Sequence, residues 1–467
     1  MLLAALALAL ASPQEAPDRP NLVLVLADDL GWTDLGCQGS GYYRTPHLDA
    51  LAAAGTRFTA GYAAAPNCAP TRAALLSGLA APRTGVLTVG SAARGRAEHR
   101  RLEVPRNRTE LDGSFTTLAE VLRGAGYRTA MIGKWHLGRG EETGPGAQGF
   151  DFHLAGDHRG HPASHFGPYT GRKGTAPPGL EGAPSGESLT DRLTDEAIAW
   201  IREQGEAPFF LYLSHYAVHT PIQAPPEILA RWEEVPAAGG HHHATYGAMV
   251  EHLDASVGRL LAALQELGHA EDTVVVFTSD NGGLGGYRDA GVDGGAEITH
   301  NAPLRGGKGM IEEGGIRVPW IVRWPGVVPA GRVVASPVHT LDLFPTLIGL
   351  AGVAAPPHDG VDLGPLWRGE VDALPARNLV WHLPIYLEAS AARGTWRCTP
   401  SAALRRGRWK LVERFETGAV ELYDLEADPG EAHDLAAELP ARAAQLHAAL
   451  LAWRERTGAA MPRAALR

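Results

Sequence analysis

The stretch NLVLVLADD, residues 21–29, points to the fold, because a run of leucine and valine leads directly into two aspartates. A short, continuously apolar run is typical of a strand buried on both faces of a parallel sheet. Similar runs follow at residues 127–132, 209–213, 273–278 and 318–322. Amphipathic helices are predicted between them. This alternation predicts an α/β domain whose large, mostly parallel sheet is flanked by helices.

The helices have recognisable ends. They are predicted over residues 117–124, 189–204, 246–267 and 340–350. The first begins at Thr116 or Thr117, where Glu120 completes a capping box, and it stops at Gly124.

The pattern changes after Pro365. Antiparallel strands are predicted over residues 379–382, 403–414 and 421–425, and a helix over residues 440–455. We therefore expect a large N-terminal domain over residues 20–365 and a smaller C-terminal α+β subdomain over residues 366–467.

Charge and apolar patterning limit the partners and the location. The 467 residues carry a net charge of −10, which argues against a nucleic-acid-binding protein. Residues 1–12 are almost entirely leucine and alanine, too short to span a bilayer, and are predicted to be a signal peptide. No other segment has the character of a membrane span. We therefore expect an exported protein, periplasmic or extracellular, without stable membrane association.

Cysteine usage is sparse. Three cysteines, Cys37, Cys68 and Cys398, exclude a dense disulfide framework but leave one bridge open.

Oxygen-bearing side chains follow two of the predicted strands. Asp28 and Asp29 end the first strand, and Asp280 and Asn281 end the strand over residues 273–278. Sites in open α/β sheets form beyond the carboxyl ends of strands, so these side chains can converge. Three carboxylates and one amide suit a hard cation such as Ca²⁺ or Mg²⁺. The alternative is that each pair is only a turn where a strand meets a loop.

Cys68 lies in the run NCAPTR, residues 67–72, just ahead of a short predicted helix. Pro70 suits the first helical turn, so the sulfur is expected beside free N–H groups at the positive end of the helix. Such a place favours a reactive sulfur species, whereas the alternative is a small buried apolar side chain. Cationic side chains near strand ends or in glycine-rich turns are Arg72, Lys134, His136, His219 and Lys308. Singly, a lysine of this kind is usually solvated, but together they can bind a tetrahedral anion and transfer protons.

The chain resembles the sulfatase family in six stretches that span nearly its whole length. They are NLVLVLADDLGWTDLGC (residues 21–37), TPHLDALAAAGTRFTAGYAAAPNCAPTRAALLSG (45–78), TLAEVLRGAGYRTAMIGKWHLG (117–138), VVVFTSDNGG (274–283), NAPLRGGKGMIEEGGIRVP (301–319) and YDLEADPGEAHDL (423–435). The resemblance implies an alkaline-phosphatase-like fold and oxidation of Cys68 to formylglycine by a maturation enzyme. It also implies one Ca²⁺, rather than Mg²⁺, held by Asp28, Asp29, residue 68, Asp280 and Asn281.

The resemblance also implies roles for the cationic residues. Calcium would polarise one hydroxyl of the hydrated formylglycine, Asp280 would assist its deprotonation, and the oxygen would attack sulfur. His219 and Lys308 would protonate the leaving oxygen. Charge on the sulfuryl group would be neutralised by Arg72, Lys134 and Lys308. His136 would deprotonate the second hydroxyl and so expel sulfate.

The implied activity is hydrolysis of a sulfate ester on a carbohydrate or an aryl alcohol. One alternative is a phosphodiesterase or phosphonate monoester hydrolase with the same fold and formylglycine. Another is a glycan-binding homologue that lacks the modification and the activity.

Two further features lie near the expected pocket. Six arginines fall between Arg94 and Arg108, where they can grip sulfates or carboxylates of a glycan or form a solvated loop. The long stretch over residues 138–186 is expected to be a functional or mobile loop, and its histidines at positions 153, 158, 161 and 165 are candidates to contact substrate.

Overall fold

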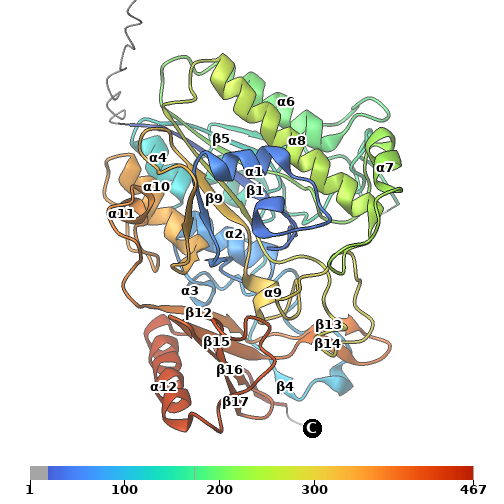
Figure 1. Ribbon diagram of the computed structural model, residues 1–467, viewed down its shortest axis with the longest axis vertical. Coiled ribbons are helices and arrows are strands. Elements are labelled where there is room, and N and C mark those ends of the chain that lie inside the picture. Colours follow the sequence, from blue (N-terminus) through green and yellow to red (C-terminus); the bar gives the residue numbers. More distant parts are fainter. Residues whose placement is uncertain (1–18, 173, 466–467) are drawn as a thin grey trace, which may run out of the picture.

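The computed structural model describes residues 19–172 and 174–465 (Figure 1). Its centre is an eight-stranded sheet with the order β10-β2-β9-β8-β1-β7-β5-β6. These strands are β1 Asn21–Ala27, β2 Thr56–Phe58, β5 Arg128–Gly133, β6 Phe152–Leu154, β7 Phe209–Ser214, β8 Thr273–Ser279, β9 Trp320–Arg323 and β10 Arg332–Val334. The predicted signal peptide, residues 1–12, lies outside the described residues.

Strand β1 lies inside the sheet and pairs in parallel with β7 and β8. Successive side chains of a strand point to opposite faces, and β1 divides accordingly between two cores. Leu22, Leu24 and Leu26 belong to one core, and Val23 and Val25 belong to the other. Burial on both faces explains why β1 is apolar at every position from Leu22 to Ala27.

Helices cover both faces, and Figure 1 shows α6 and α8 on one side of the sheet and α10 and α11 on the other. The Leu22 core is covered by α2 Cys68–Ser77, α4 Leu118–Gly124, α10 Leu343–Leu350 and α11 Gly364–Trp367. The Val23 core is covered by α1 Pro46–Ala53, α6 Leu189–Arg202, α7 Pro226–Trp232 and α8 Ala244–Glu266. The predicted α/β fold with a large, mostly parallel sheet is therefore confirmed.

Local signals placed several elements to within a few residues. The capping box at the start of α4 is formed, because the Glu120 N–H donates to Thr117 Oγ1 at 3.1 Å and the Thr117 N–H donates to Glu120 Oε2 at 2.8 Å. The strand expected over residues 318–322 is β9, which starts at Trp320 and runs antiparallel to both β8 and β2. Direction is set by the connection between strands, which an apolar run does not reveal.

The C-terminal part forms a separate antiparallel sheet with the order β12-β15-β16-β17. Its elements are β12 Asn378–Leu383, β15 Ser401–Arg406, β16 Trp409–Arg414, β17 Ala419–Asp424 and the helix α12 Pro440–Thr457. Leu446 and Leu450 of α12 pack in one core with Leu404 and Leu411 of the sheet. The prediction of one strand over residues 403–414 was wrong, because Gly407, with φ of 60°, makes a turn that divides it into β15 and β16.

A hairpin of β13 Leu387–Ser390 and β14 Thr395–Cys398 lies outside that sheet, and the sequence did not predict it. The remaining short elements are β3 Gly61–Tyr62, β4 Leu102–Glu103, β11 Val338–His339, β18 Arg463–Ala464, α3 Ala81–Thr84, α5 Gly140–Thr143 and α9 Glu313–Ile316, with 3-10 turns at Gly36–Gln38, Ala97–His99, Gly146–Gln148 and Thr340–Asp342.

The sequence predicts no membrane span after residue 12 and leaves one disulfide open. Within residues 19–172 and 174–465, none of the helices is both long enough and apolar enough to cross a bilayer. Cys37, Cys68 and Cys398 are all free, so the one disulfide that the sequence left open is not formed.

Candidate active site

The four oxygen-bearing residues meet because β1 and β8 are parallel neighbours that end at the same edge of the sheet. Asn281 donates from Nδ2 to Asp29 Oδ1 at 2.8 Å, and the Asp29 N–H donates to Asp280 Oδ1 at 3.3 Å. Asp28, Asp29, Asp280 and Asn281 are all buried. Asp29 has a φ of 65°, a left-handed conformation that aspartate tolerates better than most residues. The predicted convergence of the two pairs is therefore present.

Cys68 is the first residue of α2 and lies against this acidic group. Its sulfur and single carboxylate oxygens of Asp28 and Asp280 all lie within 4.8 Å of one another. Burial raises the pKa of the Cys68 thiol, although Lys134 and Lys308 act in the opposite direction. The position of Cys68 at the start of α2 therefore does not by itself favour the thiolate. An unmodified cysteine at this position is a protonated thiol at neutral pH.

Two cations lie among the acids and are themselves fully buried. Arg72 donates to Asp280 Oδ2 from Nε at 2.9 Å and from Nη2 at 2.7 Å. Its Nη1 donates to the backbone carbonyl of Lys134 at 2.9 Å, and that lysine donates from Nζ to Asp28 Oδ2 at 2.7 Å. The pairs fix the side chains of Asp28 and Asp280 in place. Arg72 also contacts Tyr212 and Ser214, which the sequence did not single out.

Asp29 has two basic side chains beside it, those of Lys308 and His219. Lys308 Nζ lies 2.6 Å from Asp29 Oδ1, and His219 Nε2 lies 3.5 Å from Oδ2. Burial alone would raise the pKa of Asp29, but Lys308 and His219 outweigh burial and hold that pKa below its usual range. Burial and Lys308 together lower the pKa of His219, against the effect of Asp29.

The donor set fits a divalent cation. Asp28 Oδ1 and Asn281 Oδ1 are buried and accept no hydrogen bond from any described residue. Buried oxygens of this kind cost free energy unless something pairs with them. Burial and the neighbouring Asp280 and Asp29 also raise the pKa of Asp28, against the effect of Lys134, and an adjacent cation would relieve this.

His136 follows β5 and takes a φ of 63°. Its Nδ1 is buried and has no partner among the described residues, and desolvation together with Lys134 lowers the pKa of the ring. Gly160 packs against this ring, and a Cβ at position 160 would lie 2.4 Å from His136 Cε1. The glycine therefore allows the loop to close over the imidazole.

A cavity of about 500 Å³ opens onto these groups. It is lined by Asp29, Cys68, His136, His219 and Lys308 among others. Arg72 and Lys134 are fully buried and do not belong to its lining. Of the five residues predicted to be cationic, His136, His219 and Lys308 thus line the cavity, whereas Arg72 and Lys134 are paired with buried acids outside its lining.

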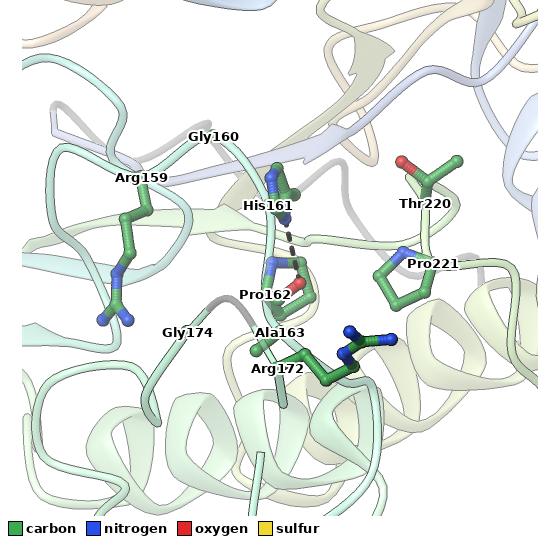
Figure 2. A pocket seen from close by; sticks show the side chains of 9 residues that line it. All are labelled: Arg159, Gly160, His161, Pro162, Ala163, Arg172, Gly174, Thr220 and Pro221. Carbon is green, nitrogen blue, oxygen red and sulfur yellow. Dashed lines mark hydrogen bonds between the residues drawn. The ribbon is translucent and has the colours of Figure 1, made fainter. Parts of the chain in front are cut away.

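A second cavity, of about 860 Å³, adjoins the first and shares Gly160, His161 and Thr220 with it. Figure 2 shows its lining, with Arg159 on one side and Arg172 nearer to Pro221. The His161 ring stacks on the His219 ring, with centroids 5.9 Å apart and planes 7° apart. Among the four loop histidines, His161 alone lines both cavities.

The C-terminal sheet supports the segment that carries Lys308. Lys410 of β16 is fully buried, and its Nζ lies 3.0 Å from Glu313 Oε1 and 2.8 Å from Glu431 Oε1. It also donates to the carbonyl oxygen of Ile311 at 3.0 Å. This ion cluster joins the loop after Lys308 to the C-terminal sheet. Sequence reasoning missed it, because three segments far apart in the chain supply its members.

Two arginines that the sequence did not assign also line the 500 Å³ cavity, Arg94 and Arg397. Arg94 lies in the arginine-rich stretch noted above, which was the available signal. Arg397 lies in the unpredicted strand β14, and no local pattern marks it.

The family comparisons cover most of the chain. A model of the sulfatase family matches residues 20–353, and one described as N-sulphoglucosamine sulphohydrolase, C-terminal, matches residues 307–456. Steryl-sulfatase of Mus musculus is 36% identical over 91% of this chain and 80% of its own length. A sulfatase of Formosa agariphila is 33% identical over 92% of this chain and 86% of its own length.

Solved structures show the same fold. Ps i-CgsB in complex with k-i-k-neocarrahexaose superposes with a TM-score of 0.75 at 28% identity, over 93% of this chain and 92% of the other.

Proposed function

The chain belongs to the sulfatase family and is a sulfuric ester hydrolase, and we propose that its substrate is a sulfated carbohydrate. The observation that carries the proposal is the group of three buried carboxylates and three cations around residue 68. These charges balance one another, so a bound divalent cation would make the site positive overall. A positive site at the end of a cavity suits an anionic ester group.

We propose that Asp28, Asp29, Asp280 and Asn281, together with residue 68, hold one divalent cation. The unpartnered oxygens of Asp28 and Asn281 support this assignment. Carboxylate and amide oxygens without nitrogen ligands favour Ca²⁺, with Mg²⁺ as the alternative. When bound, the cation supplies Lewis-acid polarisation of oxygen atoms at the site.

We further propose that a maturation enzyme converts Cys68 to formylglycine. The raised pKa of the thiol argues against catalysis by cysteine itself, because the thiolate is the nucleophilic form. Formylglycine supplies a hydrated aldehyde, a nucleophile that can release sulfate again where a serine hydroxyl cannot. Export, predicted from residues 1–12, is part of the same proposal.

The residues of the cavity have separable tasks. Lys308 keeps its proton, because Asp29 and the other acids raise its pKa despite burial, and it can neutralise charge on the ester. His219 and Lys308 lie beside each other at Asp29 and are assigned to the leaving oxygen. His136, neutral and with a free buried Nδ1, is assigned as a base. Arg72 and Lys134 hold the carboxyl groups of Asp280 and Asp28 in place through hydrogen bonds.

The two adjoining cavities support a carbohydrate rather than a small aryl ester, since together they extend well beyond the ester centre. The oligosaccharide in the complex of Ps i-CgsB, a protein of the same fold, also favours this class.

The test compares hydrolysis of an aryl sulfate, an aryl phosphodiester and a panel of sulfated saccharides by one preparation. Mass spectrometry of the peptide containing residue 68 is run on the same sample. We expect sulfate release and a formylglycine-containing peptide. Turnover of the phosphodiester alone would identify the phosphonate or phosphodiester hydrolase alternative. Saccharide binding without turnover, with an intact cysteine, would identify a glycan-binding homologue. Full activity with an unmodified cysteine would contradict the proposed chemistry.

A further inference from the structure

Arg94 and Arg397 line the active-site cavity but belong to none of the ion pairs around the acids. They come from segments about three hundred positions apart, one before β4 and one in β14. Folding brings both of them into one cavity with Cys68 and Lys308.

Backbone pairing brings the two arginines to the same place. Ala93 forms a parallel bridge with Tyr386, and the Tyr386 N–H donates to the carbonyl of Ala92 at 2.8 Å. Tyr386 directly precedes β13, where Leu387 pairs with Cys398 of β14. Arg94 and Arg397 are therefore each adjacent in sequence to a residue of this backbone pairing, Ala93 and Cys398 respectively.

A glycine allows the two segments to pack closely. A Cβ at Gly95 would lie 2.4 Å from a ring carbon of Trp396, the residue next to Arg397. Gly95 also has a φ of 70°, which most residues avoid. Arg100 braces the same loop by donating to the carbonyls of residues 93, 94 and 95 at 2.8, 3.2 and 2.9 Å. Both arginines thus project from a fixed support.

Neither arginine has a carboxylate partner in the part of the chain that the structure describes. Arg397 lies over the Tyr287 ring, with its guanidinium carbon 4.7 Å from the centroid, and its buried Nε makes no hydrogen bond to any described residue. Arg94 uses Nη2 to donate to the carbonyl of Val89 at 2.8 Å. By contrast, Arg108 in the same arginine-rich stretch pairs with Asp112 at 3.2 Å.

The charges of the cavity therefore do not cancel. Asp29 is the one carboxylate in its described lining, and Lys308 already pairs with it. Two guanidinium groups remain, in a protein whose net charge is −10. A guanidinium binds carboxylate and sulfate groups through paired, charge-assisted hydrogen bonds. The ester that reacts is assigned to the acidic centre, so the arginines are available for a different anion.

We propose that Arg94 and Arg397 bind a second anionic group on the substrate, a uronate carboxylate or a further sulfate. The preferred substrate is then a sulfated carbohydrate that carries another negative charge close to the ester that is cleaved. This inference rests on the proposed function, because it takes the cavity as the substrate site.

The test uses three matched glycosaminoglycan disaccharides. One carries a sulfate and a uronate carboxylate, the second has that carboxylate reduced to an alcohol, and the third is the reduced form with a second sulfate. Affinities are measured by calorimetry on the inactive Cys68→Ala protein, so that the answer does not require turnover. We expect the two doubly anionic sugars to bind at least about tenfold more tightly than the reduced monosulfate.

Arg94→Gln and Arg397→Gln, added singly to Cys68→Ala, should each remove most of this preference. Arg96→Gln and Arg393→Gln, two arginines outside the cavity lining on the same two segments, serve as matched controls and should retain it. Thermal unfolding of each variant identifies any that fails to fold. Affinity that is independent of the second anion, or a preference that survives both cavity substitutions, would overturn the proposal. Comparing the affinities for the uronate-containing sugar and for the disulfated sugar shows whether the second anion is a carboxylate or a sulfate.

Sulfate release by the unaltered protein reports on the proposed function separately. Activity without a second-anion preference would leave a sulfatase that lacks this subsite. The preference without activity would leave the subsite in place and overturn the enzymatic assignment.

Discussion

Arg72 and Asp280 form an ion pair in which two guanidinium nitrogens donate to one carboxylate oxygen, at 2.9 and 2.7 Å, with both side chains fully buried. Neither residue lines the cavity, although an oxygen of Asp280 lies within 4.8 Å of the Cys68 sulfur. Its first consequence is for stability, because a buried charge that loses its partner is costly.

Arg72→Gln should lower the free energy of unfolding by about 3–5 kcal/mol, because Asp280 is left buried without its main cation. Urea unfolding measures the change. The control is Arg83→Gln, whose pair with Asp359 is partly exposed, and its cost should stay below about 1 kcal/mol. The double variant Arg72→Gln/Asp280→Asn should recover part of the lost stability. Equal, small losses for both arginines would contradict this account.

Ca²⁺ should raise the unfolding temperature of chelator-treated protein. A ligand that binds only the folded state at one hundred times its dissociation constant adds about 2.7 kcal/mol of stability. Asp28→Ala and Asn281→Ala should abolish the shift, since each removes an oxygen that has no other described partner. Asp195→Ala, an exposed carboxylate elsewhere, is the control and should keep it. A shift that persists in Asp28→Ala would place the cation at another site.

His219→Ala should affect substrates according to their leaving groups. A sugar alkoxide needs a proton as it leaves, whereas a nitrophenolate does not. We therefore expect kcat/KM to fall by about 100-fold or more for a sulfated sugar and far less for a nitrophenyl sulfate. His158→Ala, an exposed histidine of the long loop, should leave the ratio of the two rates unchanged. The same loss with both substrates would mean that His219 acts before the bond breaks.

Lys410→Met should destabilise the protein by about 3–5 kcal/mol, because Glu313 and Glu431 then share a buried site without the lysine that lies between them. Activity should fall as well, since Ile311 is released close to Lys308. The comparison is Arg408→Gln on the adjoining turn, whose pairs with Asp424 and Glu426 are more exposed. That change should cost less than about 1 kcal/mol.

Acidic pH should weaken the fold through buried neutral histidines. Burial lowers the pKa of His339 from 6.5 to about 4, so between these values the unfolded chain binds a proton that the folded protein does not. Stability from this residue is therefore complete above pH 6.5 and falls as the pH drops toward 4, by about 3 kcal/mol in all. His339→Asn should flatten the pH dependence of urea unfolding over this range. His433→Asn, fully accessible to water, should not.

The acidic centre could be predicted from the sequence, because each of its residues is marked by the strand that directly precedes it. Asp28, Asp29, Asp280 and Asn281 each follow an apolar run, and parallel strands necessarily end at one edge of their sheet. The depth of Arg72 was harder to foresee. Its long side chain is fully buried and donates to Tyr212 and Ser214 on β7. A position in the sequence does not say on which side of a reactive group a flexible side chain will lie.

The residues that sequence reasoning missed depend on contacts between distant segments. Arg397 lies in a hairpin of two four-residue strands, too short for an alternating pattern to appear. Lys410 looks like any lysine on a strand until Glu313 and Glu431 are brought to it. Both residues owe their environment to the way the segments after residue 378 pack against the catalytic part of the chain.

The hairpin of β13 and β14 reaches the cavity without sharing any ion pair of the acidic centre. A change at Arg397 therefore alters the cavity lining without removing an ion pair of the acidic centre. Arg397, proposed to select the substrate, and the acids of the reacting centre therefore lie on different segments of this chain. A relative with this fold can acquire a different substrate preference through changes in this one hairpin. Exchanging the hairpin between relatives is therefore a way to transfer such a preference.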